Sequence, residues 1–176
     1  MKEDRAYKFE KIYQNESDAI FRFCLIRVSN REQALDITQE AFLRLWQSML
    51  EEKEILNDRA FLFTIAHHLI IDWYRKKKSI SLENVMQKEG ELGYDRADET
   101  FVSNLELGAE GRHLLEKISE LTPVCRYPVY LRYAENMSPR EIGVILGISA
   151  NVASVRLNRG MQELRKIAGY DGNGKI

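Results

Sequence analysis

Side chains that can recognise DNA bases gather near the C-terminal end of the sequence. Asn and Gln can each form two hydrogen bonds with adenine, and Arg can bond guanine or a phosphate. The side chains of this group share one face of a helix expected over about 150–168, because the apolar residues of this segment fall on the opposite face. Arg156 and Arg159 are the best anchors for a base or a phosphate. The candidate DNA contacts on this helix are Asn151, Ser154, Val155, Arg156, Asn158, Arg159 and Gln162.

Start and stop signals of a shorter helix precede this segment. Ser138 stands before Pro139 and three residues before Glu141, which is a capping-box arrangement with proline at the first helical position. Gly147 can adopt the left-handed conformation that ends this helix, and Ser149 can cap the next one. A helix, a glycine turn and a second helix form the helix-turn-helix pattern, whose second helix enters the major groove of DNA. An amphipathic helical hairpin with a solvated polar face is the alternative.

A second group of candidate residues is basic and lies in the N-terminal half. The run Arg75–Lys78 ends a segment, 61–78, in which Asp72 is the one acidic residue. Cations of this kind suit the phosphates of a separated DNA strand. His67 and His68 precede the run, but adjacent histidines face different directions on a helix, so we expect no metal site there.

Charge is distributed unevenly along the chain. The formal net charge is only −1, from 26 basic and 27 acidic residues. Residues 61–78 and 121–168 are basic, whereas residues 79–120 are acidic. Two basic blocks around an acidic one indicate two modules that face phosphates and a connector that avoids DNA.

The apolar pattern predicts an all-α protein made of two small helical domains. Apolar residues recur at spacings of three and four, no run alternates strictly, and the three prolines all lie after residue 120. We expect a first domain over 1–78, a flexible acidic linker over 79–110 and a second domain, with the helix-turn-helix, over 111–170.

In the first domain the expected helices cover 5–29, with Tyr7 among the inward residues, then Asn30–Met49, then a segment from a start signal at Asn57 to about Lys78. In the second domain Thr122 should cap a helix that begins at Pro123. Pro128 should bend that helix or delay its start.

Several classes of protein are not expected. The N-terminus has no apolar core of a signal peptide, and no stretch approaches the roughly 20 apolar residues of a membrane span. Cys24 and Cys125 fit small core residues of a protein in a reducing cytoplasm better than a disulfide or metal pair. From these features we expect a cytoplasmic, soluble protein. The sequence has no glycine-rich phosphate loop, no zinc-protease motif and no nucleophile elbow, so we expect no enzyme and no cofactor.

Three stretches together resemble one known family. Residues 119–166, above all LRYAENMSPREIGVILGISANVASVRLNRGMQELR, look like the C-terminal promoter-binding domain of bacterial sigma factors. Similar regions occur in response regulators, so this half alone leaves the family open. QALDITQEAFLRLWQSM at 33–49 and RAFLFTIAHHLIIDWYRKKK at 59–78 are similar to the core domain of extracytoplasmic-function sigma factors, in the expected order.

The resemblance implies that the 33–49 helix docks on the clamp helices of the largest subunit of core RNA polymerase. Carboxylates and an amide around apolar side chains make a small interface that fixes orientation. The alternative is an ordinary solvated helix face. The implied polymerase contacts are Leu35, Asp36, Gln39, Glu40, Leu43 and Arg44.

The resemblance also implies recognition of two promoter elements. The third helix would bind the −10 element and help hold the strands apart, the loop 50–60 would hold a flipped base, and the last helix would bind the −35 element. Many relatives carry Arg-Asn at the His67-His68 position, and a basic residue followed by serine at the position of Ser154 and Val155. The implied −10 contacts are His67, His68, Asp72, Arg75, Lys76, Lys77 and Lys78.

The partners implied by the family are core RNA polymerase, through its clamp helices and flap, promoter DNA, and an anti-sigma factor that holds the protein inactive. A transcription regulator that binds duplex DNA without polymerase is the first alternative. It would require a receiver or sensory domain, and the N-terminal half lacks the alternating strand and helix pattern of a receiver. A helical hydrolase is the second alternative, and no motif supports it.

Overall fold

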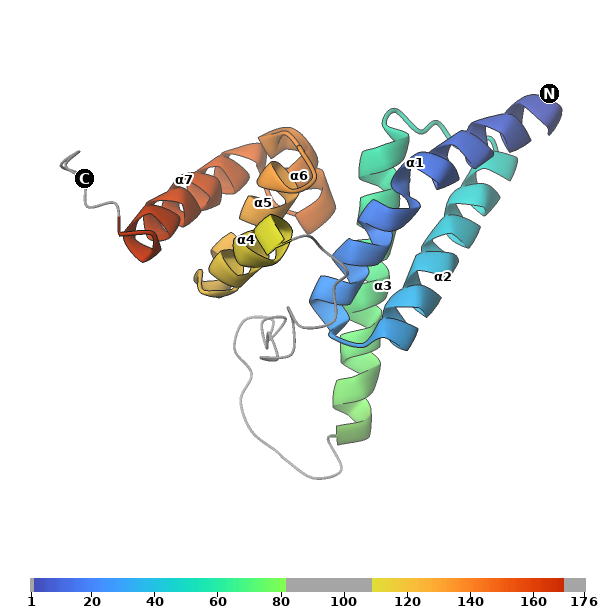
Figure 1. Cartoon of the computed structure of the whole chain (residues 1–176). Coiled ribbons are helices and arrows are strands. Elements are labelled where there is room, and N and C mark those ends of the chain that lie inside the picture. The colour runs from blue at the N-terminus through green and yellow to red at the C-terminus, as the bar shows by residue number, and fades with distance from the viewer. Residues whose placement is uncertain (1, 82–108, 170–176) are drawn as a thin grey trace. The chain divides into compact units, whose positions relative to one another are not determined.

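The computed structural model describes residues 2–81 and 109–169, which form seven helices and no strand (Figure 1). The chain divides into two compact units. The expected all-α fold with two helical domains is confirmed. The first unit contains α1 (Lys2–Val28), α2 (Arg31–Leu50) and α3 (Asp58–Ser81), and the second contains α4 (Ala109–Ser119), α5 (Pro123–Tyr133), α6 (Pro139–Leu146) and α7 (Ala150–Ile167).

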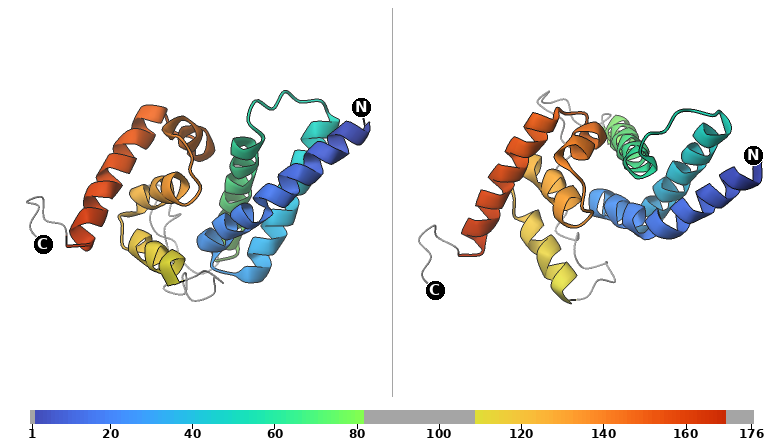
Figure 2. Two further views of the ribbon diagram at one scale, coloured as in Figure 1. Left: turned by 45° about the horizontal axis from the view of Figure 1, so that its top comes forward. Right: turned by 90° about the horizontal axis from the view of Figure 1, so that it is seen from above.

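The three helices of the first unit pack against one another around one apolar core. All three pairs of helices are in contact, and they stay side by side in the further views of Figure 2. The rings of Phe23 and Phe63 meet at the centre, with 5.2 Å between their centroids. The expected start signals are confirmed, because Asn30 Oδ1 accepts from the Gln33 N–H at 2.8 Å and Asn57 Oδ1 from the Ala60 N–H at 2.9 Å.

The N-terminal half of α1 packs on α2 through aromatic rings. Phe9 lies 5.2 Å from Trp46 and 6.2 Å from Phe42, measured between ring centroids, in edge-to-face arrangements. The prediction that Tyr7 faces inward is wrong, since its side chain is 61% exposed. Lys11 Nζ lies over that ring at 5.4 Å. Phe9, two positions further along the helix, fills the space against α2 instead.

The core of the first unit holds a polar pair. Arg27 is only 2% exposed, and its Nη1 lies 3.2 Å from Nδ1 of His67. Because arginine can only donate, Nδ1 must accept, and the imidazole is neutral. Burial and the positive charge of Arg27 lower the pKa of His67 to about 3. Nearby, Cys24 is fully buried, and burial raises the pKa of its thiol to about 12.

The second unit has its own core beneath α7. Pro128 lies inside α5 and is buried, and the helix begins at Pro123 as expected, so its start is not delayed. Thr122 occupies the N-cap position of α5, as expected, but its side chain makes no capping bond, and its hydroxyl donates to Glu163 of α7 at 3.0 Å. Cys125 is buried, as expected, and neither cysteine forms a disulfide.

The predicted linker over 79–110 stays a prediction, because most of it lies outside the described residues. Helix α3 extends to Ser81 and α4 begins at Ala109, so both helices enter the range 79–110. Residues 82–108 lie outside the described part of the chain. No helix of the described residues is long and apolar enough to cross a membrane.

The neutral state of His67 predicts a pH dependence of stability. Its pKa is about 3 in the folded unit and 6.5 without the fold, so the unfolded chain binds the extra proton as the pH falls below 6.5. The stabilisation is fully present above pH 6.5 and is lost progressively toward pH 3. Between pH 7 and pH 5 we expect the free energy of unfolding to fall by about 2 kcal/mol through this group alone.

The test is urea unfolding monitored by tryptophan fluorescence. Both tryptophans, Trp46 and Trp73, lie in the first unit, so the signal reports on that unit. His67→Gln should make the unfolding free energy clearly less sensitive to pH between 7 and 5. His68→Gln is the matched control, because the neighbouring ring is exposed, and it should retain the wild-type slope. Equal slopes in all three proteins would contradict the prediction.

Candidate nucleic-acid interface

The turn between α6 and α7 is built by local bonds and one close approach. Ser138 and Glu141 form the expected capping box, in which the Ser138 N–H donates to Glu141 Oε2 at 2.7 Å. Gly147 ends α6 with φ of 67°, a left-handed conformation that favours glycine, and Ser149 Oγ accepts from the Val152 N–H at 3.1 Å. These three predicted signals are confirmed.

Gly143 is a structural residue that the sequence reasoning missed. A Cβ atom at this position would lie 2.7 Å from the carbonyl oxygen of Ile148 and 3.2 Å from the backbone nitrogen of Ala150. Both contacts are with backbone, which cannot swing aside as a side chain can. The missing side chain therefore lets α6 lie directly against the turn that leads into α7.

Helix α7 presents a continuous exposed face to solvent. Its buried side is formed by Ala153, Leu157 and Gly160, which pack toward the core. The large apolar side chain of Val155 is 66% exposed. The Ser154 hydroxyl bonds the Ala150 carbonyl within the helix at 2.9 Å. We call the exposed set the α7 recognition face, and of the predicted residues it contains Asn151, Val155, Asn158, Arg159 and Gln162 as exposed, with Ser154 and Arg156 half-buried.

The predicted residues of α3 separate into a buried and an exposed group. His67 is buried against Arg27, whereas His68, one position along the helix, is exposed. Lys77 Nζ lies 5.0 Å over the Trp73 ring, a cation–π contact that leaves the charge at the surface. Arg75 Nη1 lies 3.7 Å from Asp72 Oδ1. The side chain of Lys78 lies outside the described part of the chain. The exposed candidates are His68, Asp72, Arg75, Lys76 and Lys77.

The loop between α2 and α3 exposes one large apolar side chain. Leu56 is 91% exposed and lies between the half-buried Ile55 and the exposed, polar Asn57. The loop is joined to α1, because Glu52 forms an ion pair with Arg5. The apolar pair Ile55 and Leu56 in an otherwise polar loop is the signal in the sequence that could have identified this position.

The predicted polymerase-binding residues of α2 form one stripe, which is exposed apart from the half-buried Glu40. Leu35 and Leu43 are 48% and 50% exposed, so two large apolar side chains face solvent among polar ones. Arg44 Nε donates to Glu40 at 2.8 Å. The opposite face of α2 is buried. We call this set the α2 stripe, which consists of Leu35, Asp36, Gln39, Glu40, Leu43 and Arg44.

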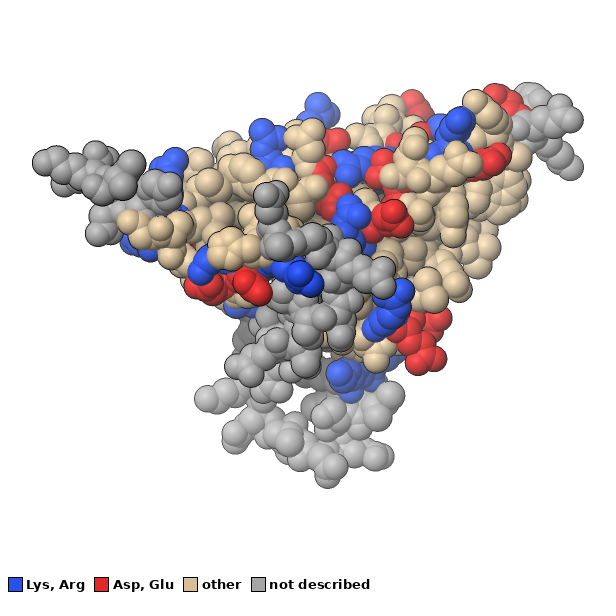
Figure 3. Space-filling model, viewed as in Figure 1, with Lys and Arg blue, Asp and Glu red and all other residues tan. Residues whose placement is uncertain are grey.

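Positive charge does not form one broad field over the visible face of the protein. Lys and Arg are interspersed there with Asp and Glu, in agreement with the net charge of −1 (Figure 3). On this face, attraction to phosphates would come from local basic groups and not from one broad field. Among the described residues, no group of His, Cys, Asp and Glu is arranged to hold a metal ion.

Comparison with known proteins gives two matches in chain order. The family model for Sigma-70 region 2 matches residues 12–80, and that for Sigma-70, region 4 matches residues 112–164. The chain is 33% identical to the ECF RNA polymerase sigma factor SigW of Bacillus subtilis, over 90% of this chain and 87% of that protein. It is 26% identical to the RNA polymerase sigma factor YlaC of the same species, over 89% and 90%.

Solved structures share the fold. The sigma factor RpoE from Bartonella quintana, in complex with the anti-sigma factor NepR, has a TM-score of 0.67 at 18% identity, covering 93% of this chain and 98% of that one. CnrH, in complex with the cytosolic domain of CnrY, has a TM-score of 0.58 at 18% identity, covering 93% and 89%. At these identities the likeness concerns the fold alone.

The close approach at Gly143 predicts that Gly143→Ala weakens the second unit. The backbone must shift to accept the methyl group, at a cost of about 1–3 kcal/mol. Amide hydrogen exchange of peptides from α6 and α7 should become correspondingly faster, while peptides from α1–α3 keep their protection. Val144→Ala changes an exposed position of the same helix and should leave exchange unaltered. Wild-type protection in Gly143→Ala would refute the prediction.

Proposed function

Because the chain belongs to the extracytoplasmic-function sigma factors of the sigma-70 family, we propose that it binds core RNA polymerase and directs transcription initiation from promoters that it selects through −10 and −35 elements. The observation that carries the proposal is that each of the two units presents an exposed polar helix face suited to binding one promoter element. These are the α7 recognition face and the C-terminal end of α3. Sigma factors regulate transcription, and the proposed role involves no catalysis by this chain.

The −35 element would be bound by the α7 recognition face. In a helix-turn-helix the second helix enters the major groove and the first stabilises it. Helix α6 precedes α7 and packs against it, which suits these two roles. Asn151, Asn158 and Gln162 carry amides able to bond adenine, and Arg159 can bond guanine or phosphate. Val155 can contact a thymine methyl group, since it is apolar and 66% exposed.

The −10 element would be bound by α3 and by the loop that precedes it. His68 and Asp72 offer polar contacts, and Arg75, Lys76 and Lys77 offer exposed cations for the phosphates of a separated strand. Leu56, whose side chain is 91% exposed in that loop, would offer an apolar contact to an unstacked base. His67 is buried, so the proposed histidine contact rests on His68.

Core polymerase would be bound by the α2 stripe, at the clamp helices of the largest subunit, with the second unit on the flap. Two half-exposed leucines surrounded by charged and amide groups suit a small interface with an apolar centre and a polar rim. Binding by two units joined in one chain raises the effective concentration of each at its own promoter element. Each interface can therefore be weak alone.

Control by an anti-sigma factor is part of the proposal. RpoE, which shares the fold, was solved with the anti-sigma factor NepR bound. Such a partner would act by covering surfaces that polymerase or DNA needs. The protein would act in the cytoplasm, where its polymerase and promoters are.

The function is tested by run-off transcription with purified bacterial core polymerase on a library of random promoter fragments, with and without the protein. We expect initiation from fragments that share two spaced sequence elements. If core polymerase gains no activity while the protein alone shifts duplex DNA, the proposed function is wrong and a polymerase-independent regulator takes its place.

The α2 stripe makes a separate prediction. Leu43→Ala should weaken binding to core polymerase about fivefold, because roughly half of a leucine side chain is lost from the interface. The fold should be unaffected, since the side chain is not part of the core. Tyr7→Ala, which truncates an exposed apolar side chain of α1, should bind core polymerase like the wild type. The measurement is a titration of core polymerase with fluorescently labelled protein, and equal affinities of Leu43→Ala and wild type would contradict it.

A further inference from the structure

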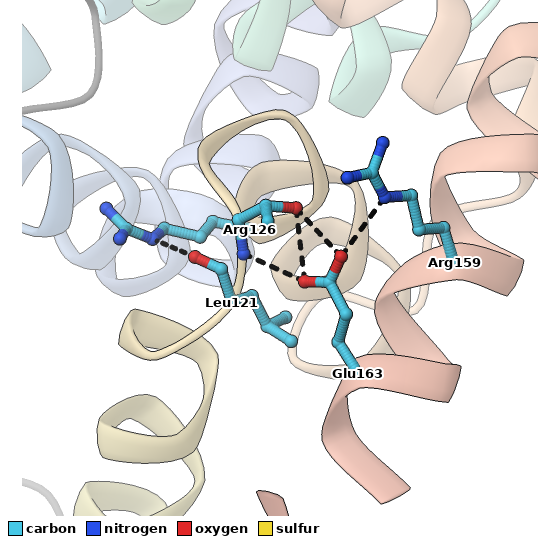
Figure 4. A network of polar contacts seen from close by, with 5 residues as sticks. Leu121, Arg126, Arg159 and Glu163 are labelled. Atoms are coloured by element: carbon cyan, nitrogen blue, oxygen red, sulfur yellow. Dashed lines mark hydrogen bonds and ion pairs between the residues drawn. The ribbon is translucent and has the colours of Figure 1, made fainter. Parts of the chain in front are cut away.

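The carboxylate of Glu163 joins the α7 recognition face to the turn between α4 and α5. Oε2 accepts a hydrogen bond from the backbone N–H of Thr122 at 2.8 Å, and Oε1 accepts one from the Thr122 hydroxyl at 3.0 Å (Figure 4). Oε1 also accepts from Nε of Arg159 at 3.1 Å, one helical turn away. One side chain therefore bridges the residue that precedes α5 and an arginine of α7.

The turn that holds the carboxylate is itself fixed in place. Arg126 Nε donates to the Leu121 carbonyl at 2.8 Å, and the Leu121 side chain is buried in the core. Burial of the Glu163 carboxyl favours a higher pKa, but hydrogen bonds from Thr122 and Arg159 outweigh burial, so the pKa is lowered. The group is therefore a carboxylate at neutral pH, held by a rigid partner.

Arg159 is held at one nitrogen and exposed at the others. Its side chain is 60% exposed, whereas that of Glu163 is 22% exposed. Only Nε faces the carboxylate, and the two terminal nitrogens of the guanidinium turn away from it (Figure 4). This terminal edge is able to form paired hydrogen bonds with guanine or with a phosphate.

We propose that Glu163 is a positioning residue for promoter recognition, which holds Arg159 by Nε so that its two terminal nitrogens meet the DNA in one orientation. This inference rests on the proposed function, and within it on contact between Arg159 and the −35 element. An arginine already held in its binding orientation loses less conformational freedom when it binds. Without the anchor, the guanidinium can reach whichever base or phosphate is nearest.

The charge of Glu163 acts in the same direction. A carboxylate beside a DNA-binding surface repels phosphates, which lowers affinity for any DNA irrespective of sequence. Glu163 therefore favours the correct base through the orientation of Arg159 and disfavours non-specific contacts through its charge. Both effects raise the ratio of specific to non-specific binding.

The experiment measures base preference at every position of the two promoter elements, by sequencing the fragments that holoenzyme transcribes from a random library. Arg159→Ala identifies the −35 position that Arg159 recognises, where preference should fall about tenfold. Glu163→Gln should lower preference at that same position about three- to fivefold, with −10 preferences unchanged. In the double variant no further loss is expected, because the two residues act through one contact.

Two further variants separate positioning from charge and from stability. Thr122→Ala keeps the charge of Glu163 but removes one of its anchors, so it should lower preference at the same position to a smaller extent. Glu116→Gln removes one negative charge from α4, outside the network, and should leave all preferences unchanged. Hydrogen exchange of α7 confirms that each variant is folded.

The outcomes distinguish this inference from the function on which it rests. If Arg159→Ala changes preference and Glu163→Gln behaves like Glu116→Gln, Glu163 positions nothing and the inference fails while the function stands. If Glu163→Gln lowers preference equally at all −35 positions, its role is general stability and the inference also fails. If the wild-type holoenzyme selects no −35 element, the proposed function fails first.

Discussion

The second unit depends on the backbone contact between Gly143 and the turn that follows α6. Helix α6 has eight residues and would not be stable alone, so its caps and its packing must hold it. Because Gly143 has no side chain, the backbone of α6 lies directly against the turn. This close packing brings α6 against α7, and Ala153 and Leu157 of α7 lie in the core. The polar face of α7 points outward as a consequence of that packing.

The first unit is organised around a different constraint, a charge buried with a neutral partner. Arg27 of α1 and His67 of α3 meet inside the core, and the Tyr74 hydroxyl donates to the carbonyl of Arg27. A buried guanidinium must keep its hydrogen bonds, so these contacts restrict how α1 and α3 can pack. The packing of the three helices, which positions the exposed end of α3 and the α2 stripe, is therefore specified by polar contacts as well as by apolar ones.

Local signals allowed much of the fold to be predicted from the sequence, whereas long-range contacts did not. Asn30, Ser138 and Ser149 cap helices as predicted, because a cap involves residues only three positions apart. Thr122 bonds Glu163, 41 residues away, and nothing in its neighbourhood indicates that. Adjacent helical positions point in different directions, so His67 and His68 were expected to differ, but the sequence did not show that His67 is the buried one.

The two cysteines give the protein a useful chemical property. Each unit contains one, both are completely buried, and the Cys24 thiol has its pKa raised to about 12, so little thiolate is available to react. A surface cysteine introduced into either unit would then be the preferred site for a maleimide dye. A donor and an acceptor placed in this way would report by energy transfer how far apart the units lie in solution, and how that distance changes when a partner binds.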